Sequence, residues 1–155
     1  MNKVLVLLVL LFLSTFSWAQ KDIDFTYEFN RDDSNPNIVN VTAEIINNLS
    51  EDIYFLSESC NELDYYLTTT SDSAEILILI HCNATFPKKI ELKANSSYEF
   101  ETIIKLNGDI KKVGLNLNLV KLKGGAEVEG KLIDAIIKAN TESTLMLEGP
   151  IKKMK

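Results

Sequence analysis

The sequence feature that most constrains the fold is a repeated alternation of apolar and polar residues with a period of two. Over residues 23–29, isoleucine, phenylalanine and tyrosine side chains alternate with aspartate, threonine and glutamate. The same alternation recurs over 39–45, 98–106 and 113–119. Successive side chains of a β-strand point to opposite faces, so this period predicts strands with one buried and one polar face.

Turn-forming residues separate these stretches, and further short strands are predicted between other turns of the chain. The segment 31–37 is rich in Asp, Asn, Ser and Pro, and Asn107-Gly108-Asp109 is typical of a hairpin turn. Further strands are predicted at 53–56, 63–69, 88–92 and 143–148. Eight or nine short strands with turns between them predict an all-β fold, an antiparallel immunoglobulin-like β-sandwich.

One segment near the C-terminus has a helical period instead. Val128, Leu132, Ile136 and Ala139 are spaced by four, four and three residues, which places them on one helix face. We therefore predict one short helical insert over 131–139.

The stretch 75–82 differs from the other strands because it is apolar on both faces. A strand of this kind is normally central in its sheet and covered on both sides. Leu77 and Leu79 then need a cover, and we expect the helical insert to lie over them as a lid. If it does not, this strand becomes a protein-binding patch or a dimer face, and Leu77, Leu79, Tyr65 and Tyr66 form the candidate interface.

The first 19 residues carry the features of a secretory signal peptide. A short positive start precedes an unbroken apolar run over 4–13, and Ser17 and Ala19 are small residues at the cleavage specificity positions. The run is shorter than the ~20 residues of a membrane span. We predict a cleaved signal peptide over 1–19, one secreted or periplasmic domain over 20–155, and no membrane span after cleavage.

The charge of the chain argues against nucleic-acid binding. The formal net charge is −6, and it becomes −7 without residues 1–19, which carry Lys3 and no acid. Nucleic-acid binders use clustered Lys and Arg to neutralise phosphates, and Arg31 is the only arginine of this sequence. Another exported or envelope protein is the expected kind of partner.

Cys60 and Cys82 are the two cysteines of the sequence. In an exported chain they pass through an oxidising compartment, where a disulfide is the default state. Redox-active thiols favour the close C-x-x-C spacing, and these two residues are 22 positions apart. We therefore predict a structural disulfide.

Residues suited to catalysis or to metal binding are few. His81 is the only histidine, and its neighbour Cys82 would point to the opposite face of a strand, so no base–nucleophile pair is predicted. With one His and paired cysteines, a zinc site lacks ligands. The oxygen-rich loop of Asp32, Asp33, Asn35 and Asn37 lacks the spacing of a calcium loop and is interpreted as a polar turn. No catalytic residue, metal or cofactor is expected.

Two other functions stay open beside protein binding. A carbohydrate-binding module would expose tyrosines from the adjacent pairs Tyr54-Phe55 and Tyr65-Tyr66 in a row. A small hydrolase would need a concave pocket that holds His81 or a close pair of carboxylates. The favoured hypothesis is a non-catalytic protein-binding or inhibitor-like module.

One stretch of about 11 residues resembles a known group of proteins. It fits the pattern I-x-L-x-(A/P)-(G/N)-x-x-(Y/F)-x-F through Ile90, Leu92, Ala94, Asn95, Tyr98 and Phe100. The pattern is similar to one edge of small exported bacterial immunoglobulin-like domains, including BsuPI-type proteinase-inhibitor-like sandwiches. The resemblance implies a sandwich fold and carries no site residues.

Overall fold

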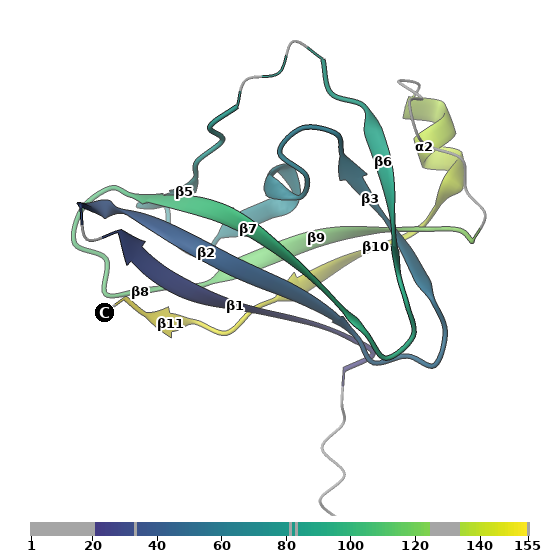
Figure 1. Cartoon of the computed structure of the whole chain (residues 1–155), viewed down its shortest axis with the longest axis horizontal. Helices are drawn as coiled ribbons and strands as arrows, with labels where there is room; N and C mark the ends of the chain where they lie inside the picture. Colours follow the sequence, from purple (N-terminus) through teal and green to yellow (C-terminus); the bar gives the residue numbers. More distant parts are fainter. Residues whose placement is uncertain (1–20, 33, 81, 83, 125–133, 155) are drawn as a thin grey trace, which may run out of the picture.

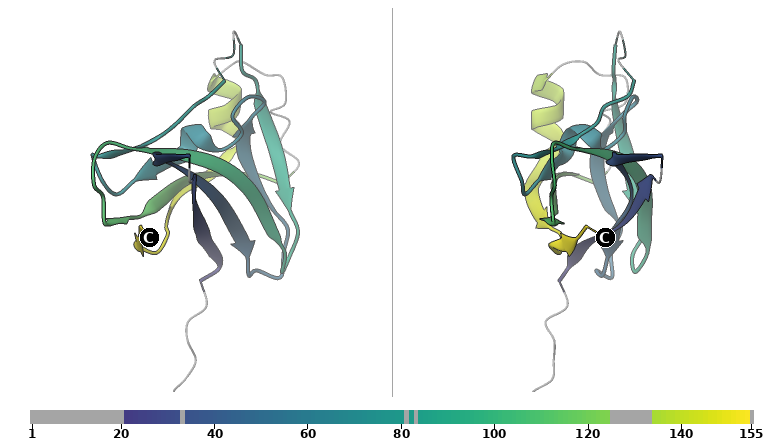
Figure 2. Two further views of the ribbon diagram at one scale, coloured as in Figure 1. Left: turned by 60° about the vertical axis from the view of Figure 1, so that its left-hand side comes forward. Right: turned by 90° about the vertical axis from the view of Figure 1, so that its left-hand side faces the viewer.

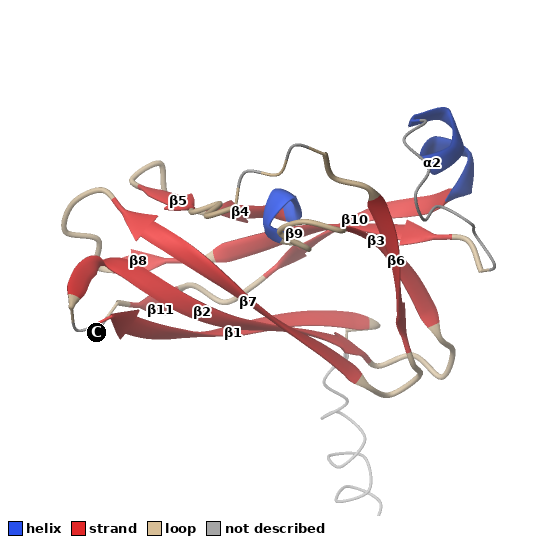
Figure 3. Cartoon of the chain, turned by 45° about the horizontal axis from the view of Figure 1, so that its top comes forward, coloured by secondary structure: helices blue, strands red, loops and turns tan. Residues whose placement is uncertain are grey.

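Two antiparallel sheets form the two layers of a β-sandwich (Figures 1 and 3). The computed structural model describes residues 21–154 except 33, 81, 83 and 125–133. Sheet A has the strand order β1-β2-β7-β5, and sheet B has the order β10-β9-β3-β6, with β4 also pairing with β9. A third, two-stranded sheet joins β11 to β8.

The elements of sheet A are β1 (Ile23–Asp32), β2 (Asn35–Asn47), β5 (Ala74–Ile76) and β7 (Ser97–Leu106). Those of sheet B are β3 (Ile53–Glu58), β4 (Leu67–Thr69), β6 (Pro87–Leu92), β9 (Leu115–Leu122) and β10 (Thr141–Glu148). The small sheet consists of β8 (Lys112–Val113) and β11 (Lys152–Lys153), and the helical elements are the 3₁₀ helix η1 (Asp64–Tyr66) and the α-helix α2 (Asp134–Asn140).

The predicted all-β antiparallel sandwich with one short helix near the C-terminus is confirmed. The alternating residues behave as expected from the pleat of a strand. Along β2, the side chains from Val39 to Asn47 are alternately buried and partly exposed, and β7 shows the same pattern. The buried faces of both sheets meet in one core, whose largest members include Phe25, Tyr27 and Phe55.

The prediction of a central strand over 75–82 is wrong. Only Ala74–Ile76 pair with β7, so β5 is a three-residue strand at the edge of sheet A. After Ile76 the chain leaves the sheet, because Cys82 is tied by a disulfide to Cys60 and the Ile80 carbonyl accepts a hydrogen bond from Asn61. The apolar side chains of this stretch therefore do not mark a doubly covered strand.

The prediction of a strand over 63–69 is correct only in its second half. Residues 64–66 form η1, and the strand β4 begins at Leu67. Leu63 is buried while Tyr65 is 52% exposed, so the chain turns here rather than continuing the alternation of a strand.

The helix predicted over 131–139 is present as α2, but its predicted role as a lid is wrong for the residues described. Ile137 of α2 packs beside Leu56 and Leu122, which belong to sheet B. Figure 1 shows α2 beside β3, β6 and β10, whereas β5 lies at the other end of the molecule. Leu132 lies outside the described residues. Within the described part of the chain, no helix has the length and apolar character needed to span a bilayer.

A fully buried asparagine joins the two sheets at one end of the sandwich. The Asn47 side-chain amide, at the end of β2, donates hydrogen bonds to the carbonyls of Glu51 (2.9 Å), Leu92 (3.3 Å) and Lys93 (3.0 Å). Its Oδ1 accepts a hydrogen bond from the Leu49 backbone N–H at 3.1 Å. This side chain therefore satisfies backbone groups from both the β2–β3 turn and the end of β6.

A buried tyrosine joins the first strand to the end of the chain. The Tyr27 hydroxyl donates to the Pro150 carbonyl and accepts from the Leu115 N–H at 3.1 Å, and its burial raises the pKa of the phenol. The Lys152 ammonium donates to the Tyr27 carbonyl and lies 5.3 Å from the centre of the Tyr27 ring. Gly149 lies against the same ring, and Figure 2 shows β11 near β1 from two directions.

Candidate functional site

Two surface loops are tied together beside the open end of sheet A. The first loop follows β3 and contains Cys60, and the second contains Cys82 between β5 and β6. The predicted disulfide joins them. The Asn61 side-chain amide donates to the Ile80 carbonyl at 2.9 Å, and the Ser59 backbone N–H donates to the Phe86 carbonyl at 2.8 Å. We call residues 59–66 and 77–86 the disulfide-linked loops.

These loops carry most of the exposed apolar side chains of the described structure. Six large hydrophobic residues are exposed in the described part of the chain, and four of them lie on the disulfide-linked loops. We call these four residues the apolar patch: Tyr65 (52% exposed), Leu79 (63%), Ile80 (62%) and Phe86 (40%). Scattered single apolar residues are normal on a protein surface, so this concentration on two tied loops is the informative feature.

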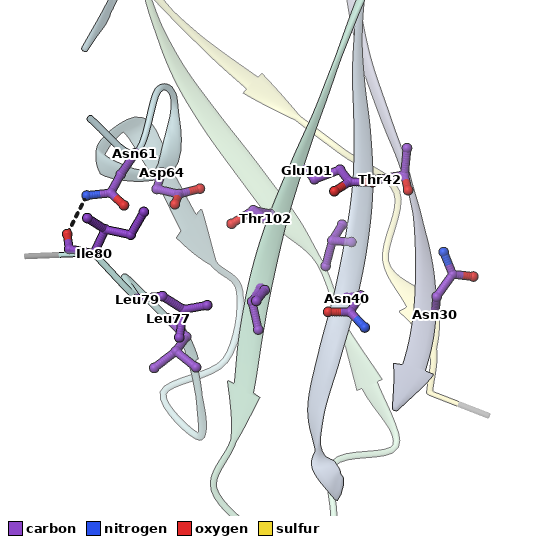
Figure 4. Close-up of a pocket in the computed structure, with 12 residues that line it drawn as sticks. Asn30, Asn40, Thr42, Asn61, Asp64, Leu77, Leu79, Ile80, Glu101 and Thr102 are labelled. Carbon is purple, nitrogen blue, oxygen red and sulfur yellow. Dashed lines mark hydrogen bonds between the residues drawn. The ribbon is translucent and has the colours of Figure 1, made fainter. Parts of the chain in front are cut away.

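A cleft of about 640 Å³ lies between the disulfide-linked loops and sheet A. Its apolar lining includes Leu77, Leu79, Ile80 and Ile103. Its polar lining includes Asn61 and Asp64 from the loops and Asn40, Glu101 and Thr102 from the sheet, as Figure 4 shows. The volume lies within the ~300–1,000 Å³ that is usual for ligand-binding pockets.

Thr102 places a hydroxyl group in this cleft without a regular hydrogen-bond partner. The residue lies on the buried face of β7 and is only 4% exposed. Its Oγ1 atom has no partner that meets ordinary hydrogen-bond geometry, although it is close enough to the Asp64 carboxylate to affect it. A buried hydroxyl without a regular hydrogen bond costs free energy, so Thr102 gives the cleft a polar group that a ligand could satisfy better than Asp64 does.

Asp64, at the start of η1, faces Thr102 across the cleft (Figure 4). Partial burial raises the pKa of its carboxyl group above the usual range, and the nearby Thr102 hydroxyl offsets part of this effect. The negative charge of Glu62 raises the pKa further. The folded protein therefore holds a partly desolvated carboxylate at neutral pH.

This carboxylate leads to a prediction for stability. Because the pKa of Asp64 is higher in the folded protein than in the unfolded chain, ionisation of this carboxyl group destabilises the fold. The contribution of the protonated group to stability is complete below the unfolded pKa, and it is lost as the pH rises through the folded pKa. Asp64→Asn should therefore raise the free energy of unfolding at pH 7, by up to about 1 kcal/mol since the group is partly solvated. Urea denaturation at pH 7 and at about pH 3, where the carboxyl is protonated, checks this.

The matched control is Asp72→Asn, which changes an exposed aspartate in the loop before β5. It should leave the unfolding free energy within about 0.5 kcal/mol of the unmodified protein at both pH values. An Asp64→Asn protein that is less stable at pH 7 would show that the Asp64 charge stabilises the fold.

The loop that begins at Cys60 holds an unusual backbone conformation. Asn61 and Glu62 have φ angles of 57° and 37°, in the left-handed region that most residues other than glycine avoid. The Tyr98 hydroxyl of β7 donates to Glu62 Oε2 at 3.1 Å, and burial beside this carboxylate raises the pKa of Tyr98 to about 12. The disulfide at Cys60 and the hydrogen bond from Tyr98 thus support a loop whose backbone includes two residues in the left-handed region.

The structure brings together three of the four predicted interface residues. Leu77 and Leu79 line the cleft, and the Tyr65 hydroxyl lies 3.5 Å from the Asn61 side-chain amide. Tyr66 instead turns toward sheet B, where it packs beside Leu56, and its hydroxyl donates to Glu58 at 3.1 Å. Burial raises the pKa of the Tyr66 phenol.

A carbohydrate-binding module would need a row of exposed tyrosines. The three candidates, Tyr54, Tyr65 and Tyr66, do not form such a row. Tyr54 and Tyr66 both pack beside the Leu56 and Leu122 cluster and are only partly exposed. Tyr65 is the exposed member of the three. A single ring gives no stacking platform for a row of sugars.

The candidate chemical groups of the sequence are only partly described by the structure. His81 and Asp33 lie outside the described residues. That His81 has no catalytic role therefore stays a prediction. Among the described residues, no group of three or more His, Cys, Asp and Glu side chains is arranged to hold a metal ion. The predicted polar turn over 31–37 is shorter than expected, because Asp32 ends β1 and pairs with Asn35, which begins β2.

Several cleft residues were not predicted from the sequence. Asn61, Asp64 and Glu101 are ordinary polar residues in a chain with many of them, and nothing in their spacing marks a site. Thr102 did leave a signal, because it is a lone hydroxyl residue on the otherwise apolar face of the strand predicted over 98–106. A polar residue at a core position is a reason to look for a partner or a ligand.

The disulfide should contribute strongly to stability. Closing a loop of 22 residues restricts the unfolded chain and is worth about 3 kcal/mol in the chain-entropy model. We expect the double variant Cys60→Ser/Cys82→Ser to lose about this much unfolding free energy in urea denaturation. Reductant should lower the stability of the unmodified protein equally and leave the double variant unchanged, and alkylation of two free thiols without reductant would contradict the pairing.

Comparison of the sequence with models of protein families finds no match, and comparison with curated proteins finds none.

Proposed function

We propose that this chain is an exported, non-catalytic protein-binding module of the inhibitor-like kind, which contacts its partner through the apolar patch on the disulfide-linked loops. The observation that carries the proposal is the placement of Tyr65, Leu79, Ile80 and Phe86 on two loops that a disulfide joins. Exposed apolar side chains grouped in this way are typical of surfaces that bind other proteins.

The way in which the patch is held also supports binding. The disulfide, the hydrogen bond from Asn61 to Ile80 and the pairing of Ser59 with Phe86 keep the two loops in one arrangement. A surface that is already ordered loses less conformational entropy when a partner binds. The sandwich acts as the rigid scaffold from which these loops project.

Two features of the sequence fit the same proposal. The predicted signal peptide over 1–19 and the paired cysteines are typical of a secreted or periplasmic protein. The proposed partner is therefore a protein that meets this chain outside the cytoplasm.

The test compares two double variants that remove equal numbers of exposed apolar side chains. Leu79→Ser/Ile80→Ser changes the apolar patch, and the control Met146→Ser/Ile151→Ser changes residues that are equally exposed elsewhere, at 62% and 66%. Both should keep the unfolding free energy within about 0.5 kcal/mol of the unmodified protein, since the changed side chains are solvated.

The measurement is cross-linking of each purified protein to the secreted and envelope fractions of its own cells, followed by quantitative mass spectrometry. The unmodified chain and the control variant should capture the same proteins, and the patch variant should fail to capture at least some of them. Equal capture by all three proteins would reject the apolar patch as the binding surface.

A further inference from the structure

One edge of sheet A is open beside the cleft. On one side β7 pairs with β2 along nearly its whole length, but on the other side β5 covers only residues 104–106. The last contact on that side is the hydrogen bond from the Leu77 N–H to the Ile103 carbonyl. Among the described residues, no strand pairs with the earlier part of β7, and Glu101, Thr102 and Ile103 line the cleft there.

The backbone groups that face this open side can be identified. Within a strand, the N–H and C=O groups of one residue point to the same edge, and the edge alternates from residue to residue. Ile103 accepts from Leu77, and Asn107 donates to the Ser73 carbonyl, so the odd-numbered residues face the β5 side. Glu99 and Glu101 therefore present their N–H and C=O groups to the open edge.

The side chains near this edge carry negative charge. Glu99 and Glu101 lie exposed on the outer face of sheet A. Glu99 lies directly opposite Glu44 of β2 in the register of the two strands, and two like charges in this position repel each other. Lys105, on the same face, is already paired with Glu75 at 3.0 Å, while Glu99 and Glu101 make no ion pair with another described residue.

The edge of sheet B is protected differently. β6 begins with Pro87 and continues with Lys88 and Lys89, and proline and lysine are common means of preventing further strands from adding to an edge. The open stretch of β7, from Ser97 to Thr102, has neither residue. Its two glutamates would repel an acidic strand and attract a basic one.

We propose that the open edge of β7 binds an extended, basic segment of a partner protein, which adds to sheet A beside Glu99 and Glu101 and continues the line of β5. This inference rests on the proposed protein-binding function and names the chemistry of the partner. Residues of the added strand that lie opposite Glu99 and Glu101 share their face of the sheet, so lysine or arginine at alternate positions fits.

The cleft completes the binding position. Residues of the added strand that lie between the two basic positions point to the other face of sheet A, the face on which the Thr102 side chain lies near Asp64. The Thr102 hydroxyl there, which makes no regular hydrogen bond within the described residues, is a group that a ligand can use. Leu77 and Leu79 lie where the added strand would meet the end of β5.

Synthetic peptides test this binding mode without knowledge of the natural partner. The probe is the capped heptapeptide Ser-Val-Lys-Val-Lys-Val-Ser, and a second peptide carries Glu in place of Lys. We expect the Lys peptide to bind at least roughly tenfold more tightly than the Glu peptide, by fluorescence anisotropy at low salt. NMR shifts should appear at the amides of residues 99–103.

Backbone methylation separates strand addition from simple charge attraction. N-methylation of both Lys residues removes the N–H groups that would pair with Glu99 and Glu101, and it should weaken binding roughly tenfold or more. N-methylation of the central Val removes an N–H group that faces away from β7, and it should change binding by less than about threefold. Equal effects of the two modifications would overturn the proposal.

Protein variants provide the matched control. Glu99→Lys/Glu101→Lys should abolish the preference for the Lys peptide, whereas Glu148→Lys, an exposed acid on β10 of the other sheet, should preserve it. If the Leu79→Ser/Ile80→Ser protein loses cellular partners but the peptides bind without these preferences, the proposed function stands and the strand-addition mode fails. If the peptides behave as expected but partner capture does not depend on the apolar patch, the edge proposal stands and the patch fails.

Discussion

Replacing Asn47 by alanine is expected to lower the free energy of unfolding by about 3 kcal/mol, because several buried backbone groups lose their hydrogen-bond partner at once. Asn47 is fully buried, and its amide reaches the carbonyls of Glu51, Leu92 and Lys93 while its Oδ1 accepts from Leu49. Alanine leaves these groups unpaired and also opens a small cavity. Equilibrium urea denaturation followed by circular dichroism measures the change.

The neighbouring residue provides the control for this experiment. The side chain of Asn48 donates to the Lys21 carbonyl at 2.8 Å, in an exposed position where water can replace it. Asn48→Ala should therefore lower the unfolding free energy by less than about 1 kcal/mol. If both variants lost similar amounts of unfolding free energy, the burial of Asn47 would not be the reason for its contribution to stability.

The second large effect is expected at Gly149, where even one added methyl group has no room. A Cβ atom there would contact the Tyr27 ring and would lie 2.8 Å from the Leu115 carbonyl oxygen. That carbonyl belongs to the backbone and accepts the Gly149 N–H at 3.0 Å, so it cannot move away without breaking this pairing. Gly149→Ala should lower the unfolding free energy by about 2–3 kcal/mol, as overpacking of a core does.

Gly124 is the matched position for this test. A Cβ atom added at Gly124 would have the Tyr54 ring as its nearest contact, at 3.9 Å, which is ordinary van der Waals contact. Gly124→Ala should change the unfolding free energy by less than about 0.5 kcal/mol. In the Gly149→Ala protein, the Tyr27 and Lys152 signals in NMR spectra should also shift, and their constancy would argue against the clash.

Much of the sandwich could be predicted because burial follows the period of the sequence. From Ile23 to Phe29 and from Val39 to Ile45, the alternation of residue types matches the alternation of buried and exposed faces in β1 and β2. The core demands apolar side chains on one face of each strand, and this demand is visible in the sequence alone. The α2 helix was predicted for the same reason, from its different period.

The stretch after Ile76 could not be predicted in this way because its apolar residues serve a different purpose. Local sequence shows that Leu77, Leu79 and Ile80 are apolar, but it does not show what lies next to them. The disulfide and the hydrogen bond from Asn61 draw the chain out of the sheet, and both depend on residues about 20 positions earlier. Long-range contacts of this kind override the local preference for a strand.

The cleft itself depends on which segments meet, and only a small part of it could be predicted. The sequence predicts Leu77, Leu79 and Tyr65 as interface residues because they are apolar or aromatic and have no assigned place in the core. Asp64 and Thr102 come from segments that are far apart in the sequence, and neither has a pattern that predicts their meeting. Their proximity follows from η1, which replaces the first half of the strand predicted over 63–69.

The contacts of Tyr27 also determine when the fold can be completed during synthesis. The partners of this residue in Pro150 and Lys152 are 123 and 125 positions later in the chain, and Leu115 is 88 positions later. A chain leaves both the ribosome and an export channel with its N-terminus first, so β1 waits without these partners until residues 150–152 have emerged. Because such distant contacts close slowly, the apolar face of β1 stays without its final cover for a large part of folding, and a chaperone would have to shield it during that time.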